Sequence, residues 1–254
     1  MIPAMLLLAA MAVALATGCS RTPQSAKEAA ELRVLCGSSM ATPAQVVGEL
    51  FRTNHQIEVT FDLGGSETLL PKVLAGTRAD VFICHDPFEQ KLKDSGDWAG
   101  SATVGILQPV LLVRPGNPQQ IRSVADLTRP NLKIGIGDPR YSTCGELFVR
   151  LLEEKGIRDQ VMKQVVLQGR THAEIANGLI LGPLDAVIVW NFVARLYGDK
   201  VELVSTTDRY AVINVTVVGL KRSRNPVQRD AFLELCRTQQ VKAIFAENGY
   251  VANP

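Results

Sequence analysis

Short apolar segments alternate with helix-like segments from residue 31 onward, and this alternation most constrains the fold. Three of the apolar segments are "LRVLC" (32–36), "ADVFIC" (79–84) and "DAVIVW" (185–190). Each is short enough for a buried strand, and each is followed by a segment with helical spacing of its apolar residues. Strands that alternate with helices are typical of layered α/β domains, so we expect an α/β fold.

Two long extended segments break this alternation. They are "VGILQPVLLVRPG" (104–116) and "YAVINVTVVGL" (210–220), and they bracket a second α/β series. We expect them to cross between two lobes, with 32–108 and 219–254 in lobe 1 and 109–218 as lobe 2 with the crossing strands. The last helix, from Asn225 and Pro226 onward, is then expected to return to lobe 1. Closure on a ligand would bend the crossings near Pro109 and Val212.

The first residues have the pattern of an export signal. The segment "MIPAMLLLAAMAVALATGC" is apolar and ends in small residues before Cys19. It resembles a bacterial lipoprotein cleavage site, with a transmembrane anchor or a plain secretory signal as alternatives. We expect 1–19 to be a signal peptide ending at a lipidated Cys19 and 20–31 to be a flexible tether. The mature protein would then be a lipoprotein held on a membrane, in the periplasm or at the cell surface.

Charge argues against a nucleic-acid partner. Lysine and arginine number 27 against 25 aspartate and glutamate residues, which leaves a formal charge of +2, and no basic run stands out. Nucleic-acid binding proteins usually carry a basic patch or stripe. We therefore expect no nucleic-acid partner.

Four loops at strand ends are candidates for a binding site, because ligands in α/β sheets bind beyond the carboxyl ends of the strands. The loops are "CGSSMAT" (36–42), "LGGSET" (63–68), "GDPRYSTCGE" (137–146) and "QGRTHAE" (168–174). Ser66 is expected to cap a helix, and three capping boxes are expected, pairing Thr42 with Gln45, Thr143 with Glu146, and Thr171 with Glu174. Capping leaves Ser38, Ser39 and Ser142 as surplus donors. Helix N-termini with spare donors attract anions.

The order and spacing of five segments resemble the molybdate/tungstate-binding proteins of bacterial ABC importers, over about residues 32–252. The segments are "GSSM", "FDLGGSETLLPKVLAGTRADVFI", "GDPRYSTCG", "DAVIVW" and "AIFAENGYV". The resemblance implies the periplasmic-binding-protein fold, with two α/β lobes joined by two crossing strands around a central cleft. It also implies a monomer without enzymatic activity or cofactor, which captures a tetrahedral oxyanion, molybdate or tungstate, and delivers it to an ABC permease.

The resemblance also implies a set of ligand contacts, all of them neutral donors. They fall on Ser39, Ser66, the backbone of Cys144, the backbone of His172, and Trp190. The last three stand where the family has alanine, valine and tyrosine. The first two changes keep the backbone donor, whereas an indole donates but cannot accept and is bulkier than a phenol.

Three further residues, Ser38, Gly65 and Thr143, are secondary candidates for the oxyanion site. Glu146 lies in the first turn of a helix that faces the cleft, where its carboxylate would repel an anion. We expect it to be turned back onto the Thr143 N–H.

The cysteines and histidines offer a second hypothesis, capture of a soft metal ion or another thiophilic ligand. Its candidate ligands are Cys36, Cys84, Cys144 and His172, with His85 nearby in sequence to Cys84, because thiolate and imidazole suit copper(I) or zinc. Alternatively, Cys36 and Cys84 end buried strands as small hydrophobic residues, or the four cysteines outside the signal (Cys36, Cys84, Cys144 and Cys236) form two disulfides.

An enzyme is a third hypothesis. Cys144 at a helix N-terminus could be a nucleophile with His172 as its base. Since no residue is recognisable as the orienting partner of that base, we expect no enzymatic activity.

Overall fold

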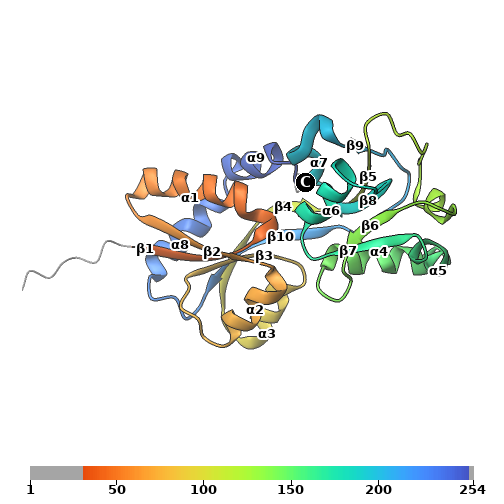
Figure 1. The fold of residues 1–254 in the computed structure, drawn as a ribbon. Helices are drawn as coiled ribbons and strands as arrows, with labels where there is room; N and C mark the ends of the chain where they lie inside the picture. The colour runs from red at the N-terminus through yellow and green to blue at the C-terminus, as the bar shows by residue number, and fades with distance from the viewer. Residues whose placement is uncertain (1–30, 252–254) are drawn as a thin grey trace, which may run out of the picture.

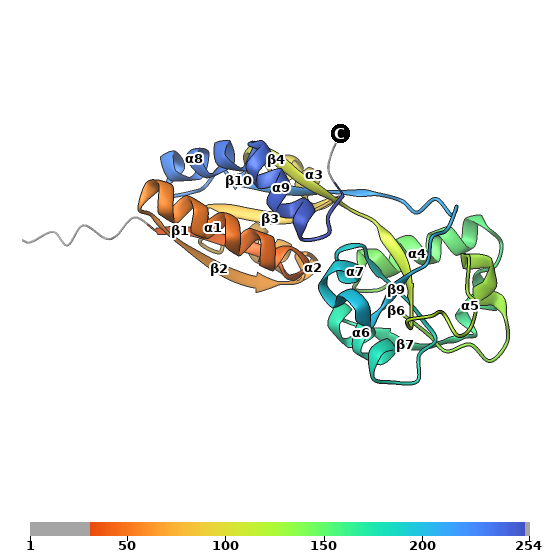
Figure 2. The ribbon, with the colours of Figure 1, turned by 90° about the horizontal axis from the view of Figure 1, so that it is seen from above.

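The computed structural model describes residues 31–251, which form two lobes side by side (Figures 1 and 2). Each lobe contains a five-stranded sheet, with strand order β2-β1-β3-β10-β4 in the first and β7-β6-β8-β5-β9 in the second. This is the two-lobed α/β architecture expected from the sequence.

The first lobe takes its elements from both ends of the described chain. Its strands are β1 (Glu31–Gly37), β2 (Glu58–Gly64), β3 (Val81–His85), β4 (Trp98–Leu107) and β10 (Ile213–Leu220). Its helices are α1 (Ala41–His55), α2 (Ser66–Leu74), α3 (Phe88–Ser95), α8 (Pro226–Cys236) and α9 (Gln239–Glu247), with the 3-10 turn η1 (Ser38–Met40). Strands β1, β2 and β3 are parallel, and β10 runs antiparallel to both β3 and β4.

The second lobe is one continuous segment. Its strands are β5 (Pro109–Val113), β6 (Ile134–Gly137), β7 (Val165–Gly169), β8 (Ala186–Trp190) and β9 (Glu202–Leu203). Its helices are α4 (Thr143–Glu154), α5 (Arg158–Met162), α6 (His172–Ile180) and α7 (Phe192–Tyr197), with the 3-10 turns η2 (Val124–Thr128) and η3 (Gly198–Lys200). Strand β6 is parallel to β7 and β8, and β5 is antiparallel to β8 and β9.

The alternation of side chains along β1 explains why helices cover both faces of the first sheet. Successive strand residues point to opposite faces. Val34 and Cys36 are in one apolar cluster with residues of α1, α8 and α9, and Leu35 is in another with residues of α2 and α3. Because both faces are covered, every position of the neighbouring strand β3 is buried.

Strand β8 in the second lobe is likewise covered by helices on both of its faces. Ile188 and Trp190 share a cluster with residues of α4, whereas Val187 and Val189 pack with residues of α6 and α7. The continuous apolar sequence of this strand therefore fills two layers at once. Its last residue, Trp190, reaches the space between the lobes.

The chain crosses between the lobes twice (Figure 2), once at Gln108 between β4 and β5, and once in 204–212 between β9 and β10. Asn191 clamps the first crossing: its side-chain oxygen accepts from the Gln108 N–H at 3.0 Å, and its own N–H donates to the Gln108 carbonyl at 2.9 Å. Strand β10 pairs along its length with β4, so it belongs wholly to the first sheet. The expected second lobe extends to residue 218, because a continuous extended segment contains no feature that shows where the chain passes from one sheet to the other.

Several helix starts differ from the expected caps. Helix α1 begins at Ala41 with Met40 as N-cap and no side-chain cap, so Thr42 lies inside the first turn and caps nothing. Likewise α2 has Gly65 as its N-cap and Ser66 as its first residue. The 3-10 turn η1 brings the chain into helical geometry before α1, and Gly65, with extended backbone, occupies the N-cap of α2, so both hydroxyl residues lie past the capping position.

Helix α4 is capped by Ser142, whose hydroxyl accepts from the Gly145 N–H at 3.3 Å. The expected box of Thr143 with Glu146 is wrong: Glu146 instead pairs with Arg150 at 2.9 Å, one turn along the helix. For α6 half of the expected box is present: the Thr171 hydroxyl accepts from the Glu174 N–H at 3.1 Å, whereas the Glu174 carboxylate accepts from the Arg170 N–H at 3.0 Å and not from Thr171.

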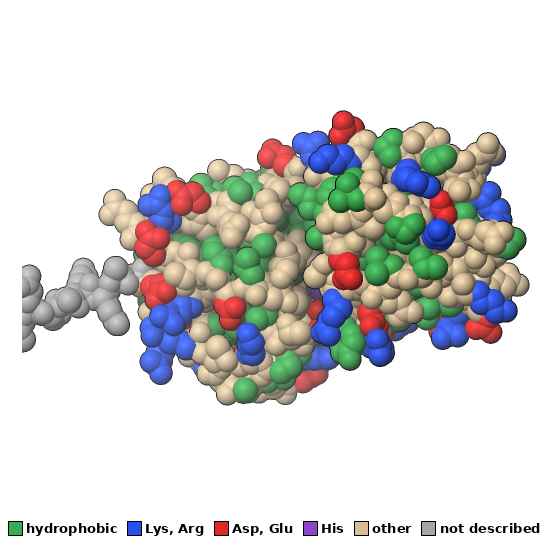
Figure 3. Space-filling view, viewed as in Figure 1, with side chains coloured by type: hydrophobic (Ala, Val, Ile, Leu, Met, Phe, Trp, Pro, Cys, Tyr) green, Lys and Arg blue, Asp and Glu red, His purple; other side chains and the backbone are tan. Residues whose placement is uncertain are grey.

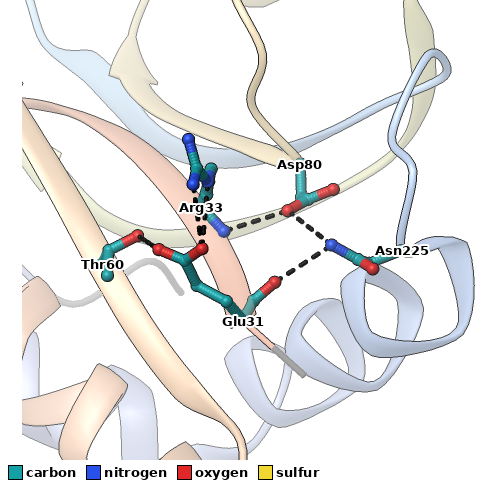
Figure 4. A network of polar contacts seen from close by, with 5 residues as sticks. All are labelled: Glu31, Arg33, Thr60, Asp80 and Asn225. Carbon is teal, nitrogen blue, oxygen red and sulfur yellow. Dashed lines mark hydrogen bonds and ion pairs between the residues drawn. The ribbon is translucent and has the colours of Figure 1, made fainter. Parts of the chain in front are cut away.

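A polar network fastens the end of the first lobe at which β1 begins (Figure 4). The Glu31 carboxylate accepts from the Thr60 hydroxyl at 2.8 Å and from Arg33, and its carbonyl accepts from the Asn225 side chain at 3.0 Å. The Asp80 carboxylate accepts from the Arg33 backbone at 2.9 Å and from the Asn225 side chain at 3.3 Å. Strands β1 and β2, the residue that precedes β3 and the N-cap of α8 are thus joined at one point.

The thiols of Cys36, Cys84, Cys144 and Cys236 are all free and buried, so the possibility of two disulfides among them is not realised. Within residues 31–251, no helix is both long enough and apolar enough to cross a membrane. The expected signal peptide, the lipidation at Cys19 and nearly all of the expected tether lie outside the described residues.

Candidate ligand cleft

A cavity of about 280 Å³ lies between the lobes, where the space-filling surface is hollowed (Figure 3). Both lobes line it at the carboxyl ends of their strands, as the rule for α/β sheets predicts. Its lining residues are Ser38, Ser39, Gly65, Ser66, Glu67, His85, Tyr141, Ser142, Thr143, Arg170, Thr171, His172, Ala173, Trp190, Phe192, Val193, Leu196 and Tyr197.

The first lobe presents small hydroxyl side chains to the cavity. Ser39 lies in η1 directly after β1, and Ser66 begins α2 directly after β2. Ser66 is only 2% exposed, and its buried Oγ has no hydrogen-bond partner in the described structure. A buried hydroxyl without a partner costs about 1–3 kcal/mol, so a ligand oxygen at this place would remove a penalty as well as add a bond.

Tyr250 supports the loop that contains Ser39 through a hydrogen bond to its backbone. Its hydroxyl donates to the Ser39 carbonyl, and its ring stacks on Phe192 of α7 with a centroid distance of 5.7 Å and an interplanar angle of 7°. Tyr250 thus contacts both the loop that contains Ser39 in the first lobe and helix α7 in the second. This role is not predictable from local sequence patterns, because the contact joins residues 211 positions apart.

The second lobe presents two helix N-termini. The end of β6 approaches α4 so closely that a side chain at either Gly137 or Gly145 would overlap the other segment: a Cβ at 145 would meet the Gly137 carbonyl, and one at 137 would meet the Ser142 hydroxyl. This contact brings the first turn of α4 to the cavity. The first-turn N–H groups of a helix have no intrahelical acceptor. That of Cys144 is therefore free to bind a ligand, whereas that of Thr143 donates to Oε1 of Glu67 in the first lobe at 3.5 Å.

Two histidines enclose Trp190. The ring of His85 in the first lobe lies 6.2 Å from that of Trp190, and the ring of His172, the first residue of α6 in the second lobe, lies 6.1 Å from it. Burial, together with the neighbouring His85, lowers the pKa of His172 to about 4, and burial also lowers the pKa of His85. Both imidazoles are therefore neutral at pH 7. The Nδ1 of His172 is buried without a partner and gives the cleft a second unsatisfied polar atom.

The cleft also contains one carboxylate, which the sequence analysis missed. Glu67 follows Ser66 in the first turn of α2, and its Oε1 accepts from the Thr143 hydroxyl of α4 at 3.0 Å. The same oxygen lies 3.5 Å from the Thr143 nitrogen and 3.8 Å from Nε2 of His85. A carboxylate of the first lobe thus reaches the N-terminal turn of a helix in the second.

Most of the expected oxyanion residues meet in this cavity. Ser39, Ser66, His172 and Trp190 line it, as do the secondary candidates Ser38, Gly65 and Thr143. The Cys144 side chain does not: it is fully buried in the core beside α4, so only its backbone can contribute, as expected. Glu146 points along α4 to Arg150 and takes no part in the lining.

The structure does not assemble the alternative metal site. Cys36 and Cys84 lie in the core on opposite faces of the first sheet, and neither lines the cleft. Burial raises the pKa of the Cys36 thiol to about 12 and raises those of Cys84 and Cys144 well above the ordinary value, which disfavours the thiolate that a soft metal needs. Among residues 31–251, no three His, Cys, Asp or Glu side chains are grouped to hold a metal ion.

Arg170 and Tyr141 complete the rim. The Arg170 guanidinium lies over the Tyr141 ring, 4.4 Å from its centroid. A cation stacked in this way at the rim of a cavity adds positive potential where an anion would enter. Both residues lie in the loops quoted from the sequence, but no spacing rule singles them out.

Comparison with known proteins agrees with this architecture. Residues 32–251 match the model of the family described as bacterial extracellular solute-binding protein. The molybdate-binding protein ModA of Mycobacterium bovis is 28% identical over 254 residues, covering 96% of this chain and 95% of that protein.

Two solved structures have the same fold. The substrate-binding domain of a putative molybdenum ABC transporter from Clostridium difficile superposes with a TM-score of 0.74 at 20% identity, covering 89% of this chain and 100% of that one. The sulfate-binding protein SubI from Mycobacterium tuberculosis superposes with a TM-score of 0.73 at 18% identity, covering 87% and 86%. At such identities the likeness establishes the fold alone.

The matched proteins are binding proteins and not enzymes, as the sequence predicts. The family match covers nearly all of the described residues and includes every strand that positions the cleft. The chain belongs to the family of bacterial extracellular solute-binding proteins.

Proposed function

We propose that the cleft captures a tetrahedral oxyanion, molybdate or tungstate, and that the protein delivers it to an ABC permease. The observation that carries the proposal is the buried, unpartnered hydroxyl of Ser66, which lines the same cavity as the first turns of α4 and α6. Hydroxyls and first-turn N–H groups are neutral donors that suit an anion. The name of the Mycobacterium bovis relative supports molybdate.

Delivery needs a cleft that opens and closes. The two crossings at Gln108 and 204–212 are the only covalent links between the lobes within the described chain, and we propose that closure bends them. Trp190 lies between His85 and His172 and so reports the relative position of the lobes. The protein is expected to act as a monomer.

A calorimetric panel of sodium molybdate, tungstate, sulfate and phosphate, with copper(I) as the metal probe, tests the function. We expect molybdate and tungstate to bind with one site per chain, and copper(I) not to bind in the cleft. Fluorescence provides an independent readout: the chain has two tryptophans, so a Trp98→Phe background isolates Trp190. Binding should change its emission. If none of the four anions gives heat or a fluorescence change, the oxyanion function is wrong.

The lipid anchor is a separate proposal. We expect the mature protein to begin at Cys19 and to carry lipid there, because the apolar segment ends in small residues directly before it. Several acyl chains hold a protein stably on a membrane, whereas one chain holds it only weakly. Mass spectrometry of the mature N-terminus checks this, with a Cys19→Ser variant as control. An unmodified Cys19 in the exported protein would refute it.

A further inference from the structure

We propose that Glu67 shares one proton with the bound oxyanion, which makes it the residue that determines anion specificity. The inference rests on the proposed function of the cleft and assigns Glu67 as an acceptor inside a site otherwise built of donors. It does not follow from the resemblance, in which the oxyanion meets neutral donors alone.

The geometry places this carboxylate where the anion must bind. Glu67 adjoins Ser66, whose free hydroxyl is the main expected donor, and its Oε1 accepts from the Thr143 hydroxyl across the cleft. That contact sets the carboxylate at the N-terminal turn of α4, which is also where the backbone donors of the second lobe lie. With 32% of its side chain exposed, Glu67 faces the cavity and is not enclosed in the core.

The surrounding charges do not neutralise it. Among the described residues that line the cleft, the only other fully charged side chain is Arg170, which stacks on Tyr141 at the rim. His85 lies 3.8 Å away on β3, but burial keeps it neutral at pH 7, and the same holds for His172 on α6. An ionised Glu67 and a dianion in this cavity would therefore repel each other.

A single proton between the two oxygens replaces a contact of two acceptors by an O–H···O bond, and it can come from either side. A monohydrogen oxyanion such as hydrogen phosphate brings the proton itself and donates its O–H to the Glu67 carboxylate. Molybdate, tungstate and sulfate have no proton at neutral pH, so Glu67 must take one from solvent and donate it to an anion oxygen. In both cases one O–H···O bond forms, and the pair of Glu67 and anion carries one negative charge more with hydrogen phosphate than with molybdate.

Proton uptake is the direct test. Calorimetry in buffers of different ionisation enthalpy should show that wild-type protein takes up about one proton per molybdate, and close to none per hydrogen phosphate at slightly alkaline pH. Since the molybdate complex then holds more protons than the free protein, its affinity should fall about tenfold per pH unit above neutrality. Molybdate binding without proton uptake would overturn the proposal.

The Glu67→Gln variant assigns the proton to this residue. Its amide can donate permanently to a fully ionised anion but is a weaker acceptor than a carboxylate, and its oxygen can still accept from Thr143. We expect proton uptake with molybdate to vanish, molybdate affinity to rise about tenfold or more, and hydrogen phosphate affinity to fall by a similar factor. The matched control is Glu146→Gln, which removes the same charge from the first turn of α4 at a side chain that pairs with Arg150 outside the cavity. It should leave both affinities unchanged.

Two outcomes would contradict the inference while leaving the proposed function intact. Persistent proton uptake in Glu67→Gln that disappears in His85→Gln would place the proton on the imidazole. Equal tightening of molybdate and hydrogen phosphate in Glu67→Gln would show that the carboxylate repels every anion alike. If no oxyanion binds either to wild type or to Glu67→Gln, the proposed function itself fails and this inference fails with it.

Discussion

Replacing Ser66 by alanine should lower the affinity for molybdate by about tenfold or more, because a hydrogen bond to a charged ligand contributes about 1.5–3 kcal/mol. The free protein should respond in the opposite direction. Its Ser66 hydroxyl is buried without a partner, so removing it should leave the melting temperature unchanged or slightly higher. Calorimetric titration and thermal unfolding of the free and molybdate-bound protein measure both effects.

Cys144→Ala is the matched comparison for Ser66→Ala. The Cys144 thiol is fully buried beside α4 and does not line the cleft, and alanine keeps the backbone N–H that is expected to bind the anion. We expect molybdate affinity to be nearly unchanged and the free energy of unfolding to fall by about 1 kcal/mol. The metal hypothesis predicts the reverse order. If Cys144→Ala abolished binding of a metal while Ser66→Ala did nothing, the oxyanion site would be wrong.

Gly145→Ala should have the largest effect on stability and should abolish binding as well. The added Cβ would overlap the Gly137 carbonyl, which is backbone and cannot rotate away, so α4 must move from the end of β6. Overpacking of a core by one methyl group commonly costs about 1–3 kcal/mol, and a clash with backbone belongs at or above the top of that range. Denaturant unfolding measures the loss of stability, and titration with molybdate measures the displacement of the α4 donors.

Gly65→Ala serves as its control in the opposite lobe. The nearest atom to a Cβ at this position is Oε2 of Glu67 at 3.3 Å, the end of a flexible side chain, and the φ of −63° suits any residue. We expect a change in unfolding free energy within about 0.5 kcal/mol. Equal losses in the two variants would show that the contact between β6 and α4 is not what positions the second wall.

The fold was predictable because its main signals are local. Strands such as β3 and β8 are continuous apolar runs, since helices cover both of their faces, and each is followed by a helix. The course of β10 was harder to predict: it pairs with β3 and β4, more than a hundred residues earlier, and nothing in its sequence tells which sheet it joins. Its start at Ile213 is decided by long-range pairing.

The site was predictable where it depends on loops that follow strands, and not where it depends on contacts between lobes. Ser39 and Ser66 follow β1 and β2, so topology alone brings them to one edge of the first sheet, and His172 follows β7 at the corresponding edge of the second sheet. Glu67 was missed because a glutamate in a first helical turn ordinarily stabilises its own helix, whereas here it reaches Thr143 on another. Glu146, the carboxylate expected to face the anion, instead pairs with Arg150 of its own helix.

The direction of β1 has a mechanical consequence. This strand starts at Glu31, in the polar network with Thr60 and Asn225, and ends at Gly37 beside the cleft, roughly 20 Å away at about 3.3 Å per residue. An attachment of the chain upstream of Glu31 would therefore hold the first lobe at the end that lies away from the cleft, and would leave the second lobe free to move about the crossings. In the proposed closure the second lobe would then move while the first lobe stays at its attachment.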